Sequence, residues 1–552
     1  MSAPRQSSSG ARFNVASHLP RMATQVPDQT ALRWPAKSGR FDSMSFARLD
    51  TLADAYAHFL VERGFGRGDR VLLMVRQGPQ LIAVTFALFK IGAVPVLIDP
   101  GMGRESFLAC IADARPTRMI GIGMAFVAKA LFRRAFRTVR TAVCSERRWW
   151  TFAPALPTPT ADVATFEPAA TTRDDLAAIL FTSGSTGPPK GVLYTHGIFD
   201  GQVAAIQRMY DIEPGETAVP AFPLFALFSV AMGMTCVIPD MDPAKPASCN
   251  PANLVHAIRD NDAQMGFGSP AIWTVVVRHC EEQGIELPSL TRMLMFGAAI
   301  PPKLMERWER IMPNGRVHTP YGATEALPVA TISSEEVLGE TAELSRQGRG
   351  ICVGRVVDQV AVEIIRISDD PIPAWSDELR LAPGQIGEIC VQGPMVTRGY
   401  DAKPDHDAAS KIADGDRFWH RMGDVGYLDE AGRLWFCGRK AHRVETAHGT
   451  MFTDPCEAIF NEHPDVYRTA LIGLGETPRI PAIVVEPEPG KYPNSPPAQK
   501  QFEAALRELA KSSELTAPIE HFFFDRAFPV DRRHNAKIHR EELAVKFARR
   551  LV

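Results

Sequence analysis

TSGSTGPPKG occupies residues 182–191 and directly follows a short apolar run, Leu176 to Phe181, that we expect to be the end of a buried strand. The ten residues include four hydroxyl side chains, three glycines and one lysine, Lys190. Glycines let backbone N–H groups approach an anion closely, hydroxyls add donors, and a lysine adds a mobile positive charge. A strand that runs into such a loop is typical of a phosphate-binding site.

Two other interpretations of this loop fit less well. A Ser/Gly linker has a similar composition, but linkers rarely end in PPKG and run straight into an apolar segment. The common P-loop motif GxxxxGK[ST] requires serine or threonine after the lysine, and Gly191 stands there. The loop is therefore predicted to bind phosphate without being a P-loop of the usual kind.

Further motifs follow in order along nearly the whole chain: GAAIPP at 297–302, YGATE at 321–325, HRMGD at 420–424, GRK at 438–440 and PVDRRHNAKIHREEL at 529–543. With the 182–191 loop they resemble the motifs of the adenylate-forming superfamily, which includes acyl-CoA synthetases, peptide-synthetase adenylation domains and luciferases. Chance agreement of all these motifs in sequence order is negligible. The resemblance implies that a carboxylate attacks the α-phosphate of ATP, which gives an acyl-adenylate and pyrophosphate.

The expected fold is α/β. VLLMV (71–75), a helical pattern from Gln80 to Lys90 and AVPVLI (93–98) form a β-α-β unit, which indicates a parallel sheet. The resemblance implies a large N-terminal domain of stacked α/β subdomains plus a β-barrel-like subdomain, and a small mobile α+β C-terminal domain. The expected boundaries are a disordered tail at 1–13, the adenylation domain at 14–438 and the C-terminal domain at 439–552.

The resemblance also assigns most of the site to the nucleotide. The 182–190 loop would hold the β- and γ-phosphates, Tyr321 and the 297–299 backbone would line the adenine, and Asp424 would accept hydrogen bonds from the ribose. The full predicted nucleotide-binding set is Thr182, Ser183, Gly184, Ser185, Thr186, Gly187, Lys190, Gly297, Ala298, Ala299, Tyr321, Gly322, Ala323, Asp424 and Arg439.

Three residues are predicted, by the same resemblance, to act at the reacting phosphate. Thr324 would contact the α-phosphate, and Glu325 would bind Mg²⁺, an ion that takes oxygen ligands and shares them with phosphates. Lys537 would stabilise the pentavalent phosphate during adenylation. A flexible lysine on a mobile domain suits a charge that is needed in only one step. Lys440 occupies the hinge position.

Composition sets outer limits on the function. A chain of 552 residues should hold at least two domains, and a net charge of −2 gives no reason to expect nucleic acid as a partner. Nine cysteines without a CxxC pair indicate neither a zinc site nor a disulfide framework, so a reduced cytoplasmic location fits best. The polar N-terminus lacks the apolar core of a signal peptide.

The stretch from Thr217 to Pro239 has no charged residue and is long enough to cross a bilayer. Pro220 and Pro223 near its start, and acidic rather than basic flanks, argue against a transmembrane span. We expect a buried strand, a turn at Pro223 and then a buried helix. The stretch could line an apolar acyl pocket or belong to the core.

Segment 131–150 carries six arginines together with Phe132, Phe136, Trp149 and Trp150. It could contact a membrane surface or a partner protein. The alternative, which we favour from the sequence, is a solvated basic helix.

Four departures from the usual acyl-CoA synthetase pattern point to one branch of the superfamily. Ala226 stands where histidine is common, Met422 replaces threonine in HRMGD, and Ala536 rather than glycine precedes Lys537. The segment KAHRVETAHGTMFTDPCE replaces the glycine-rich hairpin that builds the CoA tunnel, which argues against a CoA-dependent half-reaction. This pattern, and the opening NVASHLPRMATQVPDQTAL, resemble the β-lactone synthetases of bacterial long-chain olefin biosynthesis.

The implied substrate is a 2-alkyl-3-hydroxy fatty acid, whose own 3-hydroxyl would attack the adenylated carbonyl, expel AMP and close a β-lactone. An intramolecular nucleophile needs no CoA site, because its proximity raises its effective concentration. The base stays open: His196, His442 and His448 lie near the motifs, and each could equally be structural. Neighbouring enzymes of the olefin pathway are expected partners, in an assembly.

Two alternatives remain open. One is a long-chain fatty acyl-CoA ligase with unusual motifs, and the other is a non-catalytic nucleotide-binding scaffold. Retention of Lys190, Glu325, Asp424, Arg439 and Lys537 together argues against the scaffold, because a dead enzyme has no physical need for all five.

Overall fold

The structure is a computed structural model that describes residues 11–36, 39–158, 163–182, 189–530 and 537–549. The apolar run before the motif is strand β7 (Leu176–Thr182), as predicted. Strand β8 (Lys190–Thr195) runs antiparallel to it, with Thr182 opposite Lys190. The loop between them contains residues 183–188, which lie outside the described residues.

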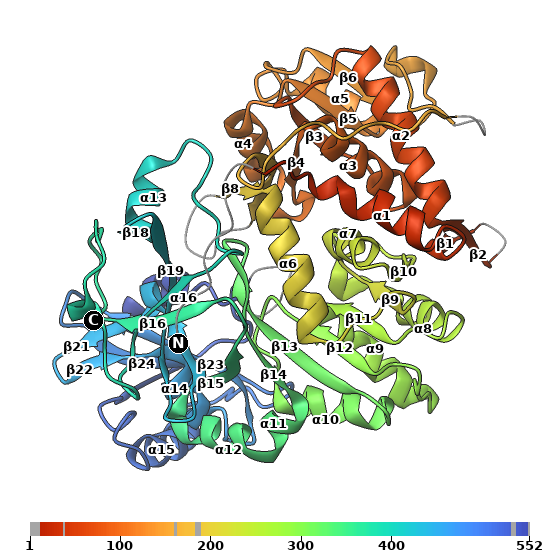
Figure 1. Cartoon of the computed structure of the whole chain (residues 1–552). Helices are drawn as coiled ribbons and strands as arrows, with labels where there is room; N and C mark the ends of the chain where they lie inside the picture. The colour runs from red at the N-terminus through yellow and green to blue at the C-terminus, as the bar shows by residue number, and fades with distance from the viewer. Residues whose placement is uncertain (1–10, 37–38, 159–162, 183–188, 531–536, 550–552) are drawn as a thin grey trace.

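The first sheet lies at the top of Figure 1, in orange to yellow, and contains the predicted β-α-β unit. Its strand order is β6 (Thr141–Cys144), β5 (Arg118–Gly121), β3 (Arg70–Met74), β4 (Val94–Ile98), β7 and β8. Strands β3 and β4 pair in parallel, and helix α3 (Pro79–Ile91) joins them, which confirms the unit. Gly92 ends α3 at φ 75°, a left-handed conformation that glycine adopts without strain. The other helices here are α4 (Arg104–Ala114) and α5 (Gly123–Leu131).

A second, larger sheet joins a mainly parallel half to an antiparallel half. Its order is β16 (Ala361–Ile365), β17 (Gly387–Gln392), β19 (Arg417–Leu428), β20 (Arg433–Arg439), β15 (Ile351–Val356), β14 (Ala326–Ser333), β13 (Arg316–Ala323), β12 (Arg292–Met295), β11 (Met265–Gly268), β9 (Thr217–Pro220), β10 (Thr235–Val237), β1 (Thr30–Pro35) and β2 (Phe41–Ser45), with β18 (Lys411–Asp414) beside β19. The parallel half is the second α/β subdomain. The antiparallel half stands where the resemblance implies a β-barrel-like subdomain, but its described strands form one end of this open sheet and not a closed barrel.

Helices flank the two sheets and fill the space between them. One core cluster combines apolar side chains of α1, α2, α3, α6 and α7 with residues of β3 and β7 from the first sheet and of β1 and β10 from the second. Figure 1 shows α6 running from the first subdomain to the second. The remaining helix bounds are α1 (His18–Gln25), α2 (Phe46–Glu62), α6 (His196–Met209), α7 (Pro223–Ala231), α8 (Pro251–Arg259), α9 (Pro270–Gln283), α10 (Pro302–Ile311), α11 (Ser334–Glu336), α12 (Ala342–Leu344) and α13 (Pro404–Ser410).

The uncharged stretch folds into β9, α7 and β10. The strand and the helix are as expected. Pro223 is the first residue of α7, a position whose N–H has no partner within a helix, so proline is tolerated there. No helix in the described part of the chain is long and apolar enough to cross a membrane.

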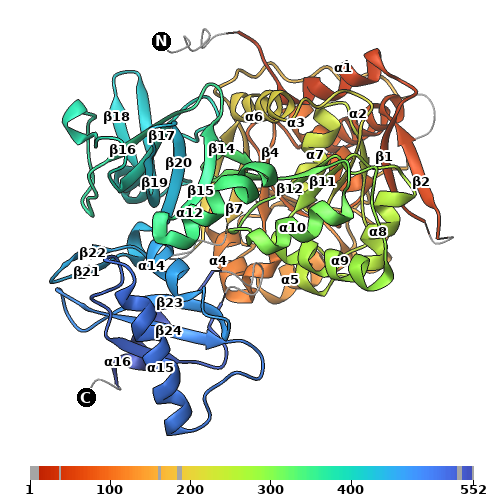
Figure 2. The ribbon, with the colours of Figure 1, turned by 90° about the horizontal axis from the view of Figure 1, so that it is seen from below.

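The chain leaves the large sheet where β20 ends, at Arg439, and continues as a separate lobe, drawn in blue in Figure 2. Its elements are a two-stranded hairpin of β21 (Val444–Thr446) and β22 (Gly449–Met451), helix α14 (Thr453–Phe460), a three-stranded sheet of β23 (Val466–Leu474), β24 (Ile480–Pro487) and β25 (His521–Phe524), and helices α15 (Pro496–Lys511) and α16 (Arg540–Ala548). This lobe has the α+β composition that the resemblance implies.

Two local expectations need correction. The expected disordered tail at 1–13 extends too far, because Arg12 pairs with Thr172 and the Phe13 N–H donates to the Thr171 carbonyl at 2.8 Å. Residues 1–10 lie outside the described residues. Segment 131–150 is not a basic helix: α5 ends at Leu131, Phe136 turns into the core, and β6 pairs with β5. Burial and strand pairing here override the helical appearance of the arginine spacing.

All nine cysteines lie within the described ranges, and all are buried and unpaired. Burial raises the pKa of the Cys110 thiol to about 12 and that of Cys280 to about 11. These thiols are packing residues.

Candidate active site

A single large cavity, of about 1670 Å³, collects the predicted site residues. Those that line it are Lys190, Gly297, Ala298, Ala299, Tyr321, Gly322, Ala323, Thr324, Glu325, Asp424, Arg439, Lys440 and Lys537. Thr182 belongs to the same hairpin through its pairing with Lys190. Ser183, Gly184, Ser185, Thr186 and Gly187 lie outside the described residues.

One end of the cavity holds a buried acid, a tyrosine and an arginine. The Tyr321 hydroxyl donates to Oδ2 of Asp424 at 2.6 Å, and Nη1 of Arg439 lies 2.7 Å from Oδ1 of the same carboxylate. Asp424 and Arg439 stand opposite each other on β19 and β20, so the sheet register itself forms the ion pair. Burial raises the pKa of Asp424, and the positive charge of Arg439 opposes that rise.

Thr324 and Glu325 lie on the tight connection between β13 and β14. A Cβ at Gly322 would lie 2.5 Å from the Ala326 carbonyl oxygen, so the turn requires glycine there. The Tyr194 hydroxyl donates to the Thr324 carbonyl at 2.5 Å. These contacts hold the connection at the cavity wall.

Tyr400 contacts both Glu325 and Lys190, the first residue of β8. Its hydroxyl donates to Oε1 of Glu325 at 2.8 Å, and Nζ of Lys190 lies 5.1 Å from the centre of its ring. Tyr400 therefore contacts a carboxylate through its hydroxyl and a lysine through its ring, and all three residues line the cavity. Sequence reasoning missed Tyr400, although the GY that contains it follows a short β run.

Lys411 is a second residue that sequence reasoning missed. Its ammonium group donates to the Thr397 carbonyl, and the Thr397 N–H donates to the Glu325 carbonyl at 2.8 Å. Burial lowers the pKa of Lys411 to about 7, although the charges of Glu325 and Asp407 oppose this. No local motif marks a buried lysine in a sequence, because lysine is normally exposed.

Lys537 reaches the cavity from the C-terminal lobe. Ile538 forms a bridge with Val530, and three residues after Lys537 the Arg540 guanidinium contacts both carboxylate oxygens of Glu457 at 2.8 Å. Glu457 also accepts the Leu471 N–H at 2.8 Å. This buried ion pair ties the start of α16 to α14, and thereby fixes where Lys537 can lie.

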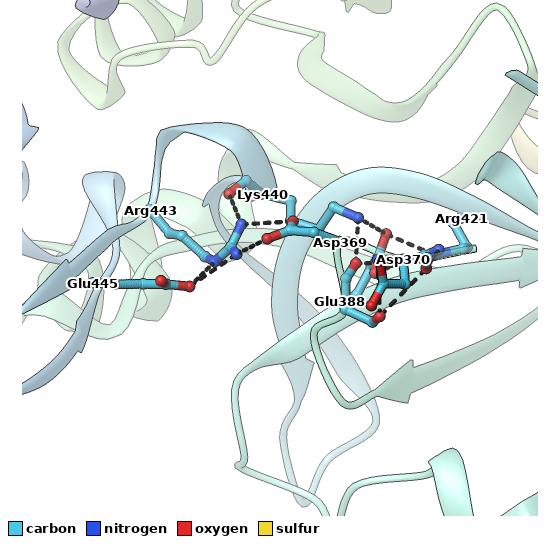
Figure 3. Close-up of polar contacts among 8 residues, drawn as sticks. Asp369, Asp370, Glu388, Arg421, Lys440, Arg443 and Glu445 are labelled. Atoms are coloured by element: carbon cyan, nitrogen blue, oxygen red, sulfur yellow. Dashed lines mark hydrogen bonds and ion pairs between the residues drawn. The ribbon is translucent and has the colours of Figure 1, made fainter. Parts of the chain in front are cut away.

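The predicted hinge residue sits in a polar cluster that crosses the domain boundary (Figure 3). Nζ of Lys440 lies 3.1 Å from Glu388 and donates to the Ser368 carbonyl at 2.8 Å. Glu388 is also paired with Arg421 at 2.6 Å, and both of these side chains are almost fully buried. Arg443, on the C-terminal side, contacts Asp369 at 2.5 Å. The cluster joins the start of the C-terminal lobe, which carries Lys537, to β17 and the loop at Asp369.

The histidines named from the sequence do not line the cavity. His196 accepts the Val15 N–H at 3.2 Å inside the core, and burial lowers its pKa to about 4. His442 lies 3.5 Å from Glu541, and His448 is exposed in the β21–β22 turn. Among the described histidines, those in the lining are His406 and His420.

His420 is buried, and its Nδ1 has no hydrogen-bond partner among the described residues. Burial is the main reason why its pKa lies well below the ordinary value, so the ring is neutral near pH 7.

Apolar side chains from both α/β subdomains extend the cavity beyond the polar end. The first subdomain contributes Leu73, Met74, Leu97, Ile98, Phe107, Ile122 and Met124, and the second contributes Phe225, Phe228, Ile272, Ile300, Met305 and Val337. Phe225 and Phe228 belong to α7, so the uncharged stretch lines this space and is also core.

Glu325 fits a magnesium ion that is held jointly with phosphates. The described residues contain no group of three or more His, Cys, Asp or Glu side chains that could hold a metal alone. Magnesium is usually bound by one or two carboxylates, with substrate phosphates and water completing its shell. The Glu325 carboxylate, on the same cavity as Lys190, is such a donor.

The cavity brings together Lys190 of the β7–β8 hairpin, the buried Asp424–Arg439 pair and Lys537 from the C-terminal lobe, the arrangement expected of an adenylate-forming site. The chain belongs to the AMP-binding enzyme family, whose model matches residues 19–401. Two curated relatives are named olefin beta-lactone synthetase. The protein from Stenotrophomonas maltophilia is 44% identical, over 96% of this chain and 97% of the relative. The protein from Xanthomonas campestris is 43% identical, over 98% of each.

Solved structures share the fold at lower identity. The amide bond synthetase McbA from Marinactinospora thermotolerans superposes with a TM-score of 0.78 at 23% identity, over 97% of this chain and 99% of that one. The o-succinylbenzoate coenzyme A synthetase of Bacillus subtilis in complex with ATP and magnesium gives 0.74 at 19% identity, over 95% and 98%. These matches confirm the expected fold class.

Proposed function

We propose that the protein is an ATP-dependent β-lactone synthetase that acts on a 2-alkyl-3-hydroxy fatty acid in olefin biosynthesis. The observation that carries the proposal is the cavity in which Lys190, Glu325 and Lys537 meet and which continues into apolar space. The 44% identity to an olefin beta-lactone synthetase over nearly the full length supports it.

In the first step, an oxygen of the substrate carboxylate attacks the α-phosphorus of ATP, and the bond from that phosphorus to pyrophosphate breaks. Lys190 and the loop after Thr182 bind the leaving phosphates, and Thr324 contacts the α-phosphate. Lys537 offsets the negative charge that develops on the pentavalent phosphorus. Magnesium bound at Glu325 would neutralise phosphate charge.

In the second step, the 3-hydroxyl oxygen attacks the acyl carbon, the bond from that carbon to AMP breaks, and a four-membered lactone closes. The hydroxyl proton must pass to a base. His420 and His406 are the histidine candidates that the cavity offers, in place of His196, His442 and His448. His420 is neutral near pH 7, and its Nδ1 has no hydrogen-bond partner among the described residues.

The size of the cavity suits a substrate with two alkyl chains. Ligand pockets commonly measure about 300–1,000 Å³, and this one is about 1670 Å³ with apolar walls from both subdomains. A nucleotide and a branched fatty acid together would use this volume.

The proposal includes a cytoplasmic location, in keeping with nine unpaired cysteines. It also includes cooperation with neighbouring enzymes of the olefin pathway, because a β-lactone is reactive and poorly soluble.

Product analysis tests the proposal. The protein is incubated with ATP, Mg²⁺ and a synthetic 2-alkyl-3-hydroxy fatty acid, with and without CoA, and the products are identified by NMR and mass spectrometry. A β-lactone and AMP, formed equally well without CoA, are the expected result. A thioester that appears only with CoA would instead make the protein an acyl-CoA ligase. Absence of pyrophosphate release with every hydroxy acid would favour a nucleotide-binding scaffold.

A further inference from the structure

Helix α5 and the segment after β6 expose an unusual set of large apolar side chains. Phe152 is 92% exposed, Trp149 85%, Leu131 70%, Met124 64% and Trp150 37%. Ten large hydrophobic side chains are this exposed in the described part of the chain, and half of them fall within residues 124–152. Exposed apolar groups scattered singly need no explanation, but a group of them in one region marks a contact surface.

These side chains belong to one surface. A Cβ at Gly123, the first residue of α5, would lie 2.8 Å from the Trp150 ring, so the ring packs on the start of the helix. Trp150 also shares a shallow groove with Leu131 and Arg133. The Phe152 N–H donates to the Trp149 carbonyl at 3.3 Å, which closes the turn that presents both rings. We refer to Met124, Leu131, Trp149, Trp150 and Phe152 as the α5 patch.

The surroundings of the patch are strongly basic. Residues 124–152 contain seven basic side chains and one acidic side chain, in a chain whose net charge is −2. The acidic residue, Glu146, is already paired with Arg148 at 3.1 Å and lies 3.8 Å from Arg76. Arg133, Arg134 and Arg147 are exposed, and no ion pair involves them within the described ranges. The region therefore presents excess positive charge beside apolar side chains.

The patch adjoins the mouth of the substrate cavity. Met124 lines that cavity and is also 64% exposed, so the cavity wall reaches the surface at this residue. Ile122, Ala125 and Arg76 line the cavity beside it. A ligand that enters past Met124 passes the α5 patch.

We propose that the α5 patch docks on the surface of an anionic phospholipid membrane, from which the acyl substrate enters the cavity. Aromatic side chains settle at the level of lipid headgroups, and arginines bind lipid phosphates, so this combination complements such a surface. The choice of a membrane over a protein partner rests on the proposed function, because a fatty acid with two alkyl chains resides in bilayers.

Co-flotation of the purified full-length protein with vesicles tests the docking without any turnover. Vesicles of phosphatidylcholine alone are compared with vesicles that contain one quarter phosphatidylglycerol, at low and high salt. We expect binding to the anionic vesicles, weakened by salt because its electrostatic part is screened. The double variant Trp149→Ser/Phe152→Ser should bind at least tenfold more weakly. The control variant Tyr467→Ser/Ile480→Ser removes two exposed apolar side chains from the C-terminal lobe and should bind like the wild type.

Activity separates docking from catalysis. The Trp149→Ser/Phe152→Ser variant should release pyrophosphate normally with a short-chain, water-soluble hydroxy acid, and several-fold more slowly with a long-chain substrate presented in anionic vesicles. Failure of the wild type to bind any vesicle, or unchanged binding by this variant, would overturn the proposal. A partner protein that binds the wild type but not the variant, without vesicle binding, would assign the patch to a protein interface instead. Inactivity of the wild type on the soluble substrate would count against the proposed function. The vesicle-binding experiment does not depend on turnover, so it would still test the docking.

Discussion

The hydroxyl of Tyr400 donates a 2.8 Å hydrogen bond to the carboxylate of Glu325, a residue 75 positions away in the sequence. The Asp407 carboxylate in turn accepts the Tyr400 N–H at 2.8 Å. The proposed magnesium ligand is thus oriented by a side chain from a different segment of the chain. Such outer contacts fix how a metal ligand points.

Tyr400→Phe should therefore raise the magnesium requirement of adenylation while the fold is kept. A hydrogen bond to a charged group contributes about 1.5–3 kcal/mol, so we expect roughly a tenfold or larger fall in turnover at limiting Mg²⁺, and a smaller fall at saturation. A magnesium titration of pyrophosphate release measures this. Tyr427→Phe is the matched control, because its hydroxyl contacts the Arg349 carbonyl outside the cavity. An unchanged titration for Tyr400→Phe would remove this tyrosine from the site.

Lys537→Ala should abolish adenylate formation but leave ATP binding largely intact, because the charge acts on the transition state. Pyrophosphate exchange measures the first property and calorimetry the second. Lys511→Ala, which removes an exposed lysine from α15, serves as the control. Near-normal exchange by Lys537→Ala would show that the C-terminal lobe does not supply the catalytic charge.

Arg540→Met should unfold or displace the end of the C-terminal lobe. Breaking a buried ion pair by removing one partner typically costs about 3–5 kcal/mol, whereas replacing both partners with apolar groups is often neutral. The double variant Arg540→Met/Glu457→Met should recover most of the stability that the single variant loses. Thermal unfolding combined with limited proteolysis measures the stability of the C-terminal lobe. Equal losses of stability in the single and double variants would contradict the proposed role of the ion pair.

The hinge cluster in Figure 3 predicts unequal contributions from two arginines. Arg421→Met leaves Glu388 buried with only Lys440 as a charged partner and should destabilise by roughly 3 kcal/mol or more. Arg443→Met removes contacts to Asp369 and Glu445, which are both exposed, and should lose about 1 kcal/mol or less. The urea unfolding midpoints of the two variants measure these losses. Equal shifts of the two midpoints would contradict the predicted difference.

We expect the lowered pKa of Lys411 to make the stability of the protein depend on pH. This pKa is lowered by burial, from 10.5 to about 7, so between these values the unfolded chain binds a proton that the folded protein does not. The free energy of unfolding therefore rises with pH across this window through Lys411. Lys411→Met should remove that part of the slope, and the difference between wild-type and variant unfolding midpoints from pH 7 to 10 measures it. Parallel pH profiles would mean that Lys411 titrates normally.

Sequence reasoning identified what is encoded locally. The β3-α3-β4 unit follows from apolar periodicity, and the placement of Lys190, Glu325, Asp424 and Lys537 on one cavity follows from the order of the motifs. Contacts between distant segments left no local pattern. Tyr400 and His420 line the cavity, and Lys411 pairs with His420 across β18 and β19, which no local sequence pattern predicts. Segment 131–150 was misjudged because its arginine spacing resembles a helix, while Phe136 and β6 are held by tertiary packing.

Because every native thiol is buried, the protein can be labelled with a dye at a single introduced cysteine. A single cysteine introduced at an exposed site, such as Thr450 in the β21–β22 hairpin, should react with a maleimide dye far faster than the nine buried ones. A second one on the N-terminal domain would complete a donor–acceptor pair. Energy transfer between the two dyes would then show whether the C-terminal lobe moves during turnover.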